Sequence, residues 1–312
     1  MQNQPIASSS IMPPIRLFVV VLAALAAVPA DAAPKVVVAI KPIHSLVAGV
    51  MTGIGEPGLI VAGGVSPHEY ALKPSDAARL ESADIVFWIG PIFESFLAKP
   101  LAALATKAEI VELDRMPGVH LLPARAGGAW EEDEDHQARS ALEEDGHLWL
   151  DPENAEAIVR YTVARLSAHD PGNAQRYAAN GAALLDRIAA LDGRLRGELA
   201  PVTGVPFVVF HDAYQYLEHR YGLDAIGSIT VSPEHLPGAR RLEEIHGKIT
   251  TLGARCVFSE PPFTPRLVET LTVGTKARAG VLDPEAVALP RGPDLYFQLM
   301  DRLADHLVRC LE

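Results

Sequence analysis

The sequence contains few cysteines and few basic residues, and each shortage excludes a class of protein. Two cysteines in 312 residues are too few for a disulfide-rich scaffold or for a zinc site built from thiolates. Lysine and arginine number 27 against 39 acidic residues, and the net charge of −12 is unlike that of a nucleic-acid-binding protein. The chain does have 49% hydrophobic residues, enough for a folded core, and its length suggests two domains of roughly 150 residues each.

Long hydrophobic runs are also scarce. Leu17–Val28 is an unbroken apolar run of 12 residues, preceded by Arg16 and followed by the A-x-A pattern Ala30-Asp31-Ala32. Because a membrane-spanning helix needs about 20 residues, we interpret residues 1–33 as a cleaved export signal rather than a permanent anchor. No cysteine lies near the cleavage point, so we expect no membrane anchor on the mature chain.

Short apolar runs alternate with helical patterns in both halves of the remaining chain. Strands are predicted at residues 35–41, 59–62, 84–90 and 109–113, and again at 206–210, 225–231, 255–259 and 280–282. Helices are predicted at 43–51, 74–82, 93–104, 213–221, 238–252, 265–273 and 295–310. Continuous apolar strands that alternate with helices indicate an α/β fold with parallel sheets.

A helical region separates the two halves. One helix is predicted at 155–168 and a second at 171–199, which would be roughly 43 Å long at 1.5 Å per residue. We therefore expect two lobes, each a small parallel sheet flanked by helices, joined by a long rigid helix. The expected boundaries are 34–152 for the N-terminal lobe, 153–202 for the linking helical region and 203–312 for the C-terminal lobe.

One segment of the N-terminal lobe, residues 123–146, lacks periodicity. It contains the acidic runs 131–135 and 143–145, so we interpret it as an acidic surface loop. Two roles remain open for it: a weak collector of cations, or a solvated linker without a function.

Three histidines and an aspartate stand where strands end or loops close. His68 follows the second predicted strand, His147 closes the acidic loop, His211 follows the first strand of the second half, and Asp283 follows the last strand. In open α/β sheets, ligands bind beyond the carboxyl ends of the strands. Neutral imidazoles suit zinc, which takes four nitrogen or oxygen ligands in a tetrahedron. A single histidine is more often structural, but these four positions, two from each half, fit a metal site shared between the lobes.

Seven segments carry a resemblance to a known family. In chain order they are KPIHSLV, SPHEYALKPSD, ADIVFWIGP, GHLWLDP, FHDAYQYLEHRYGL, CVFSEPPF and LDP. Together they resemble the zinc-specific periplasmic solute-binding proteins of ABC transporters, the ZnuA family, over about residues 34–312. The resemblance implies two lobes joined by a long rigid helix, in agreement with the helical region described above.

The resemblance also implies the site residues. The zinc histidines of the family fall on His68, His147 and His211, and histidine at 211, where related manganese-binding proteins have glutamate, favours zinc. Some zinc members use a glutamate just before the first histidine, but this chain has Pro67 there. The fourth ligand is then Asp283 or a water molecule, and we favour Asp283.

Three further residues receive expected roles, and a disulfide is expected. His44 and Glu260 lie near the predicted cleft, where they could support the ligands from a second shell. The resemblance implies a disulfide between Cys256 and Cys310, which an oxidising compartment permits. Asp212 is adjacent to a ligand position, and we expect it to cap the following helix.

The expected function is therefore transport and not catalysis. The protein would bind Zn²⁺ in the periplasm as a monomer and deliver it to the membrane permease of an ABC importer. Two alternatives remain open: a Mn²⁺ or Fe²⁺ carrier of the same superfamily, and a secreted zinc hydrolase. The hydrolase is disfavoured because the sequence has no H-E-x-x-H motif.

Overall fold

The fold is described from a computed structural model that covers residues 1–2, 33–64, 66–125, 144–230, 237–263 and 265–312. Ala32–Glu312 forms one compact unit. The predicted export signal, apart from its ends, and residues 126–143 of the predicted acidic loop lie outside the described residues. Within the described part, no helix has both the length and the apolar character needed to cross a membrane.

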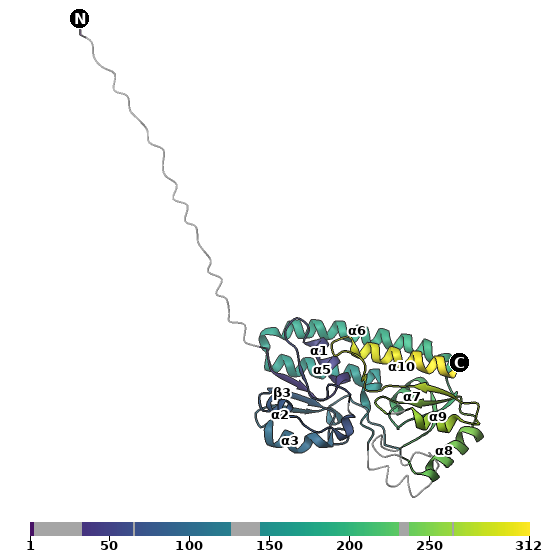
Figure 1. Ribbon diagram of the computed structural model, residues 1–312. Helices are drawn as coiled ribbons and strands as arrows, with labels where there is room; N and C mark the ends of the chain where they lie inside the picture. Colours follow the sequence, from purple (N-terminus) through teal and green to yellow (C-terminus); the bar gives the residue numbers. More distant parts are fainter. Residues whose placement is uncertain (3–32, 65, 126–143, 231–236, 264) are drawn as a thin grey trace. The chain divides into compact units, whose positions relative to one another are not determined.

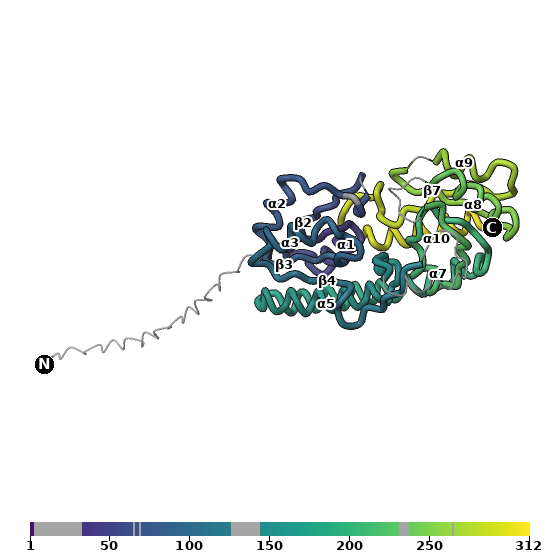
Figure 2. The backbone as a smooth tube through the Cα atoms, turned by 90° about the horizontal axis from the view of Figure 1, so that it is seen from below, coloured from purple at the N-terminus to yellow at the C-terminus, as the bar shows by residue number. Residues whose placement is uncertain are grey.

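The first lobe is built on a sheet of four parallel strands in the order β2-β1-β3-β4. The strands are β1 (Val36–Val38), β2 (Gly58–Leu59), β3 (Ile85–Trp88) and β4 (Glu109–Glu112), and the helices that follow the first three are α1 (Lys41–Val50), α2 (Pro74–Glu81) and α3 (Ala98–Leu104). The strands β1 and β3 are buried at every position. This explains their continuous apolar sequences, because both faces of the sheet are covered (Figures 1 and 2).

The second lobe repeats this arrangement with the strand order β6-β5-β7-β8. The strands are β5 (Pro206–Val209), β6 (Asp224–Ser228), β7 (Cys256–Ser259) and β8 (Arg278–Val281), and the helices are α7 (Gln215–Tyr221), α8 (Ala239–Thr251), α9 (Arg266–Thr272) and α10 (Leu295–Leu311). All pairs in both sheets are parallel. The predicted fold class, two lobes each with a small parallel sheet and flanking helices, is confirmed.

Element boundaries differ from the predictions where local chemistry decides them. Helix α5 (Pro152–His169) begins three residues earlier than predicted, because the Asp151 carboxylate accepts a hydrogen bond from the N–H of Glu153 at 2.9 Å. The helix predicted from residue 93 begins only at residue 98, after a 3₁₀ turn over Ser95–Leu97.

The long helix of the linking region is α6 (Ala174–Leu199), preceded by a 3₁₀ turn at Pro171–Asn173. Its buried side chains recur at helical spacing: Tyr177, Gly181, Leu184, Ile188, Leu191, Leu195 and Leu199. This face packs against α5, α1 and α10, so α6 runs alongside elements of both lobes (Figure 1). Side chains from both sheets and from these helices form a single apolar cluster.

A disulfide ties the last helix to the second sheet. Cys256 of β7 and Cys310 of α10 are bonded, with their Cα atoms 6.1 Å apart, as predicted. Both residues are buried. Among the described residues there is no free cysteine.

A buried glutamate follows the third strand of the first sheet. Glu94 is fully buried, and its Oε2 accepts hydrogen bonds from the backbone N–H groups of Ile89 at 2.9 Å and Gly90 at 3.2 Å. Burial raises the pKa of Glu94 to about 8, and burial likewise raises that of Asp114 to about 6. A carboxyl group whose pKa is higher in the folded than in the unfolded chain stabilises the fold below its unfolded pKa, and this contribution is lost as the pH rises through the folded pKa.

We therefore expect the metal-free protein to lose on the order of 3 kcal/mol of unfolding free energy between pH 5 and pH 8 through Glu94 alone. In Glu94→Gln the side-chain oxygen can still accept both N–H groups, but the group no longer titrates. Urea unfolding at the two pH values should show a smaller decline in Glu94→Gln than in the wild type. Asp114 titrates in both proteins, so its contribution cancels in the comparison. Glu56→Gln, which changes an exposed glutamate, is the matched control. Equal declines in all three proteins would contradict the prediction.

Candidate metal centre

His68 comes from a short turn that follows the second strand of the first lobe. It lies in the 3₁₀ turn η1 (Pro67–Glu69), which Ser66 caps by accepting a hydrogen bond from the N–H of His68 at 3.3 Å. The ring packs edge-on against Phe93, with the ring centroids 4.6 Å apart. A proline and a capping serine thus hold the backbone, and an aromatic ring limits the rotation of the imidazole.

His147 comes from the end of the loop that leads into the linking helices. It precedes the turn η4 (Leu148–Leu150), and it is 6% exposed. Asp145 holds it twice: one carboxylate oxygen accepts from the backbone N–H of His147 at 2.9 Å and lies 2.7 Å from ring Nδ1. An imidazole that donates from Nδ1 to this carboxylate keeps a lone pair on Nε2 for a metal ion.

His211 comes from the second lobe, two residues after the end of β5, and is 5% exposed. Its Nδ1 is hydrogen-bonded to Oε2 of Glu260, which follows β7. The hydroxyl of Tyr214 donates to the other oxygen of Glu260 at 2.6 Å. A buried carboxylate therefore orients this imidazole as well, in the same sense as Asp145 orients His147.

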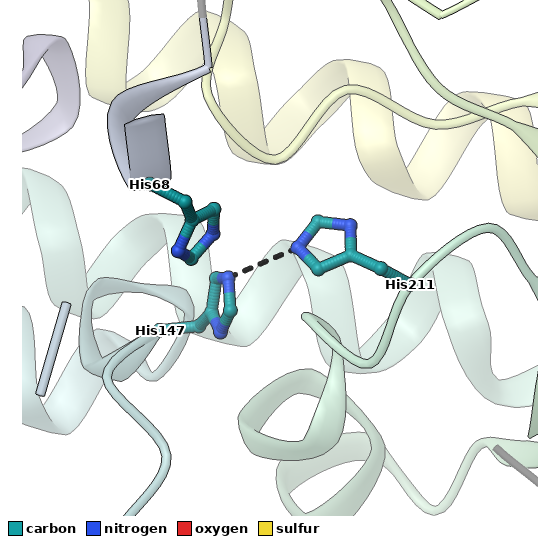
Figure 3. Close-up of side chains that lie close together, drawn as sticks. All are labelled: His68, His147 and His211. Atoms are coloured by element: carbon teal, nitrogen blue, oxygen red, sulfur yellow. Dashed lines mark hydrogen bonds between the residues drawn. The ribbon is translucent and has the colours of Figure 1, made fainter. Parts of the chain in front are cut away.

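The three imidazoles meet between the lobes (Figure 3). Metal ligands in proteins come mostly from histidine, cysteine, aspartate and glutamate. Within the described part of the chain, His68, His147 and His211 are the one group of three or more such residues whose ligand atoms all lie within 4.8 Å of one another. The Nε2 atoms of His147 and His211 are 3.2 Å apart. In a tetrahedral zinc site with bonds of 2.0–2.1 Å, two ligand nitrogens lie about 3.3 Å apart, so this spacing fits the metal.

The hydrogen bonds around the cluster are compatible with a cation too. A neutral imidazole that donates from Nδ1 to a carboxylate keeps a lone pair on Nε2, and two such nitrogens facing each other form an arrangement that a shared cation stabilises. Burial, together with the nearby His147 and His211, lowers the pKa of His68 well below its usual range. Zinc binds neutral imidazole, so this shift favours the form of His68 that ligation requires.

The predicted fourth ligand is not among the converging atoms. Asp283 follows β8, and its carboxylate accepts a hydrogen bond from the N–H of Glu285 at 3.2 Å. Burial raises the pKa of Asp283, and interactions with the backbone of the same turn partly offset that rise. Glu285 instead lines a small cavity of about 20 Å³ together with His68, His211 and Glu260. Among the described atoms, its Oε1 is buried without a hydrogen-bond partner.

Of the two residues expected to support the ligands, one contacts a histidine of the cluster and the other does not. Glu260 contacts a candidate ligand directly, as described above. His44 is buried on α1, but its Nε2 lies 3.0 Å from the carbonyl oxygen of Pro57, and its cavity is lined by residues of 48–57 and 291–293, with none of the three histidines. Burial lowers the pKa of His44. The structure thus places His44 away from the cluster.

Two residues near the histidines, Asp145 and Arg125, are not predicted from the sequence. For a third, Asp212, the predicted role is wrong. Asp145 falls within the acidic loop, although its position two residues before His147 could have suggested a local hydrogen bond. Arg125 carries no signal in the sequence, and it forms ion pairs with both Asp212 and Glu218. The expectation that Asp212 caps a helix was wrong, because α7 begins at residue 215 without a side-chain cap and Asp212 is bound to Arg125 instead.

An open cavity leads to the histidines from the side of the acidic loop. Its volume is about 520 Å³, and it is lined by His68 and His147 together with Arg125, Glu144 and Asp212. Glu144 bridges to Pro123 in an isolated antiparallel pair, so the two ends of the loop meet at this cavity. A small cation has space to reach the nitrogen atoms by this route.

Comparisons with known proteins agree with this geometry. The family model described as zinc-uptake complex component A, periplasmic, matches residues 36–310. The high-affinity zinc uptake system protein ZnuA of Brucella abortus is 46% identical over 305 residues, covering 88% of this chain and 91% of the relative. The protein of the same description from Paracoccus denitrificans is 35% identical and covers 92% and 94%.

Solved structures share the fold. A crystal structure of ZnuA has a TM-score of 0.76 at 24% identity, covering 90% of this chain and all of that one. A Zn(II)-bound mutant variant of AdcAII from Streptococcus pneumoniae has a TM-score of 0.74 at 24% identity and covers 90% and 99%. From the match over residues 36–310 and the identity with curated relatives, the chain belongs to the ZnuA family of periplasmic zinc-uptake components.

Proposed function

We propose that this protein is the zinc-binding solute-binding component of an ABC-type importer, which binds Zn²⁺ in the periplasm and delivers it to a membrane permease. The observation that carries the proposal is the convergence of three imidazoles, with two Nε2 atoms 3.2 Å apart. Curated relatives over nearly the whole chain are named high-affinity zinc uptake proteins. The proposed ligands are His68, His147 and His211, with Asp283 as the fourth.

The ligand set favours zinc over manganese. Three imidazole nitrogens suit zinc, whereas manganese prefers carboxylate and water oxygens. The carboxylates of Asp145 and Glu260 are held by Nδ1 atoms, which leaves them as orienting groups. Asp283 follows β8, and a movement of its turn toward the histidines would add one carboxylate to the three nitrogens.

Zinc titration tests the proposal directly. Calorimetry on the metal-free protein should show one tight site, and competition with Mn²⁺ should leave zinc bound. The same samples should not turn over ester or peptide substrates, which separates a carrier from a zinc hydrolase. Preference for Mn²⁺, or measurable turnover, would contradict the proposed function.

The orienting carboxylates supply a second test. Glu260→Gln keeps the size of the side chain but exchanges a charged acceptor at Nδ1 of His211 for an amide. Loss of such a partner typically weakens metal binding 10–100-fold, so we expect the zinc dissociation constant of this variant to rise by about that factor. Glu244→Gln changes a half-exposed glutamate of α8 and is the control. An unchanged zinc affinity in Glu260→Gln would show that this carboxylate has no part in holding the ligand.

A further inference from the structure

A buried lysine of the first lobe is held by the second lobe. Lys41 is the first residue of α1 and is only 6% exposed. Its Nζ donates to three backbone carbonyl oxygens: Ala286 at 3.2 Å, Val287 at 2.9 Å and Leu289 at 3.0 Å. An ammonium group has three protons, so its donor capacity is fully used.

These three carbonyl groups belong to the turn that carries the proposed fourth ligand. The turn over residues 283–289 connects β8 to the segment before α10, and it includes both Asp283 and Glu285. Ala286, at its centre, has φ of 54°, a left-handed conformation that alanine rarely adopts. A residue persists in such a conformation only where its surroundings impose it, and the carbonyl bonds to Lys41 are a suitable constraint.

The first lobe also holds this turn at one other point, and it holds the start of α10, which follows the turn, at another. Trp149, two residues after His147, donates from its indole N–H to the carbonyl oxygen of Pro284 at 3.0 Å. Ser45, one helical turn after Lys41, accepts from the N–H of Tyr296 at 3.0 Å. The turn thus belongs to the second lobe by sequence but is anchored on the first.

Lys41 also touches the segment that leads to His68. Gly63 has φ of +107°, and a Cβ atom there would lie 2.7 Å from Nζ of Lys41. The ammonium group is therefore enclosed between the segment that leads toward His68 and the turn that carries Asp283. Burial lowers the pKa of Lys41. The nearby carboxylates of Asp283 and Glu285 act in the opposite direction and favour the charged ammonium group.

We propose that Lys41 is a positioning residue, which fixes the turn at 283–289 against the first lobe so that the carboxylate of Asp283 can complete the metal site. This inference rests on the proposed zinc function. In Lys41→Met the side chain keeps its length but loses every donor, so three buried carbonyl oxygens lose their partner. The turn would then relax, and the position of Asp283 relative to the histidines would no longer be fixed.

The test is a double-mutant cycle on zinc affinity with the full mature chain. We expect the zinc dissociation constant to rise 10- to 100-fold in Lys41→Met and by a similar factor in Asp283→Ala. In the double variant the rise should be no larger than in Asp283→Ala alone, because Lys41 acts through the turn. Lys99→Met, at an exposed lysine of α3, should bind zinc as the wild type does.

The outcomes separate the inference from the function on which it rests. A wild type without a tight zinc site would overturn the function. With that site intact, an unchanged zinc affinity in Lys41→Met or in Asp283→Ala would overturn the role of Lys41. The role would also be overturned if Lys41→Met weakened zinc binding by the same factor in the wild type and in the Asp283→Ala variant. Thermal melting of each metal-free variant identifies any that do not fold, and Lys41→Gln, which retains two donor protons, replaces Lys41→Met if that variant is unfolded.

Discussion

Replacing His147 with alanine is expected to weaken zinc binding about 1000-fold, a loss of about 4 kcal/mol. The substitution removes one of the three converging nitrogens, and it also leaves the buried Asp145 carboxylate without the ring that it contacts at 2.7 Å. Competition against a chelator of known zinc affinity measures the change.

The matched control for this substitution is His219→Ala. His219 is an exposed histidine of α7, so its removal should leave the zinc dissociation constant within about twofold of the wild-type value. If His147→Ala bound zinc as tightly as His219→Ala, the three-histidine site would be the wrong assignment.

Removing the disulfide is expected to produce the largest loss of stability. The bond between Cys256 and Cys310 closes a loop with a sequence separation of 54, which contributes about 4 kcal/mol in the chain-entropy account. For a chain of this size, the melting temperature of Cys256→Ala/Cys310→Ala should fall by about 10 °C. Calorimetry of the metal-free protein measures it, because bound zinc would add its own stabilisation.

Zinc binding by the disulfide variant should change little. Cys256 begins β7, whereas Glu260 and the histidine that it contacts lie beyond the other end of that strand. The two properties can therefore be separated in one protein. A melting temperature equal to that of the wild type would contradict the stabilising role, and a large loss of zinc affinity would show that the disulfide supports the site as well.

The positions of the histidines could be predicted because they follow from topology. His68 and His211 each follow a parallel strand, β2 and β5, and the parallel strands of a sheet present their carboxyl ends at one edge. The paired sheets follow from the continuous apolar runs in the same way. These are local patterns, and a single sequence contains them.

The contacts of Lys41 and Arg125 could not be predicted, because they join distant segments. Lys41 meets the carbonyl of Val287 across 246 positions of sequence, and Arg125 meets Asp212 across 87. Nothing in the residues around Lys41 distinguishes it from a solvated lysine at the start of a helix. The place of Asp283 relative to the three nitrogens depends on such contacts, which is why strand order alone does not determine it.

The shared apolar cluster has a consequence for the modularity of the fold. It includes Val37 of the first sheet, Phe258 of the second, Ile188 of α6 and Leu303 of α10. The second lobe has a smaller apolar cluster of its own, but the larger cluster is common to both lobes, since α6 and α10 cover parts of both. The lobes are therefore not exchangeable parts: a hybrid that joined one lobe of this chain to the other lobe of a distant relative would bring together two halves of an interior that had not evolved to fit.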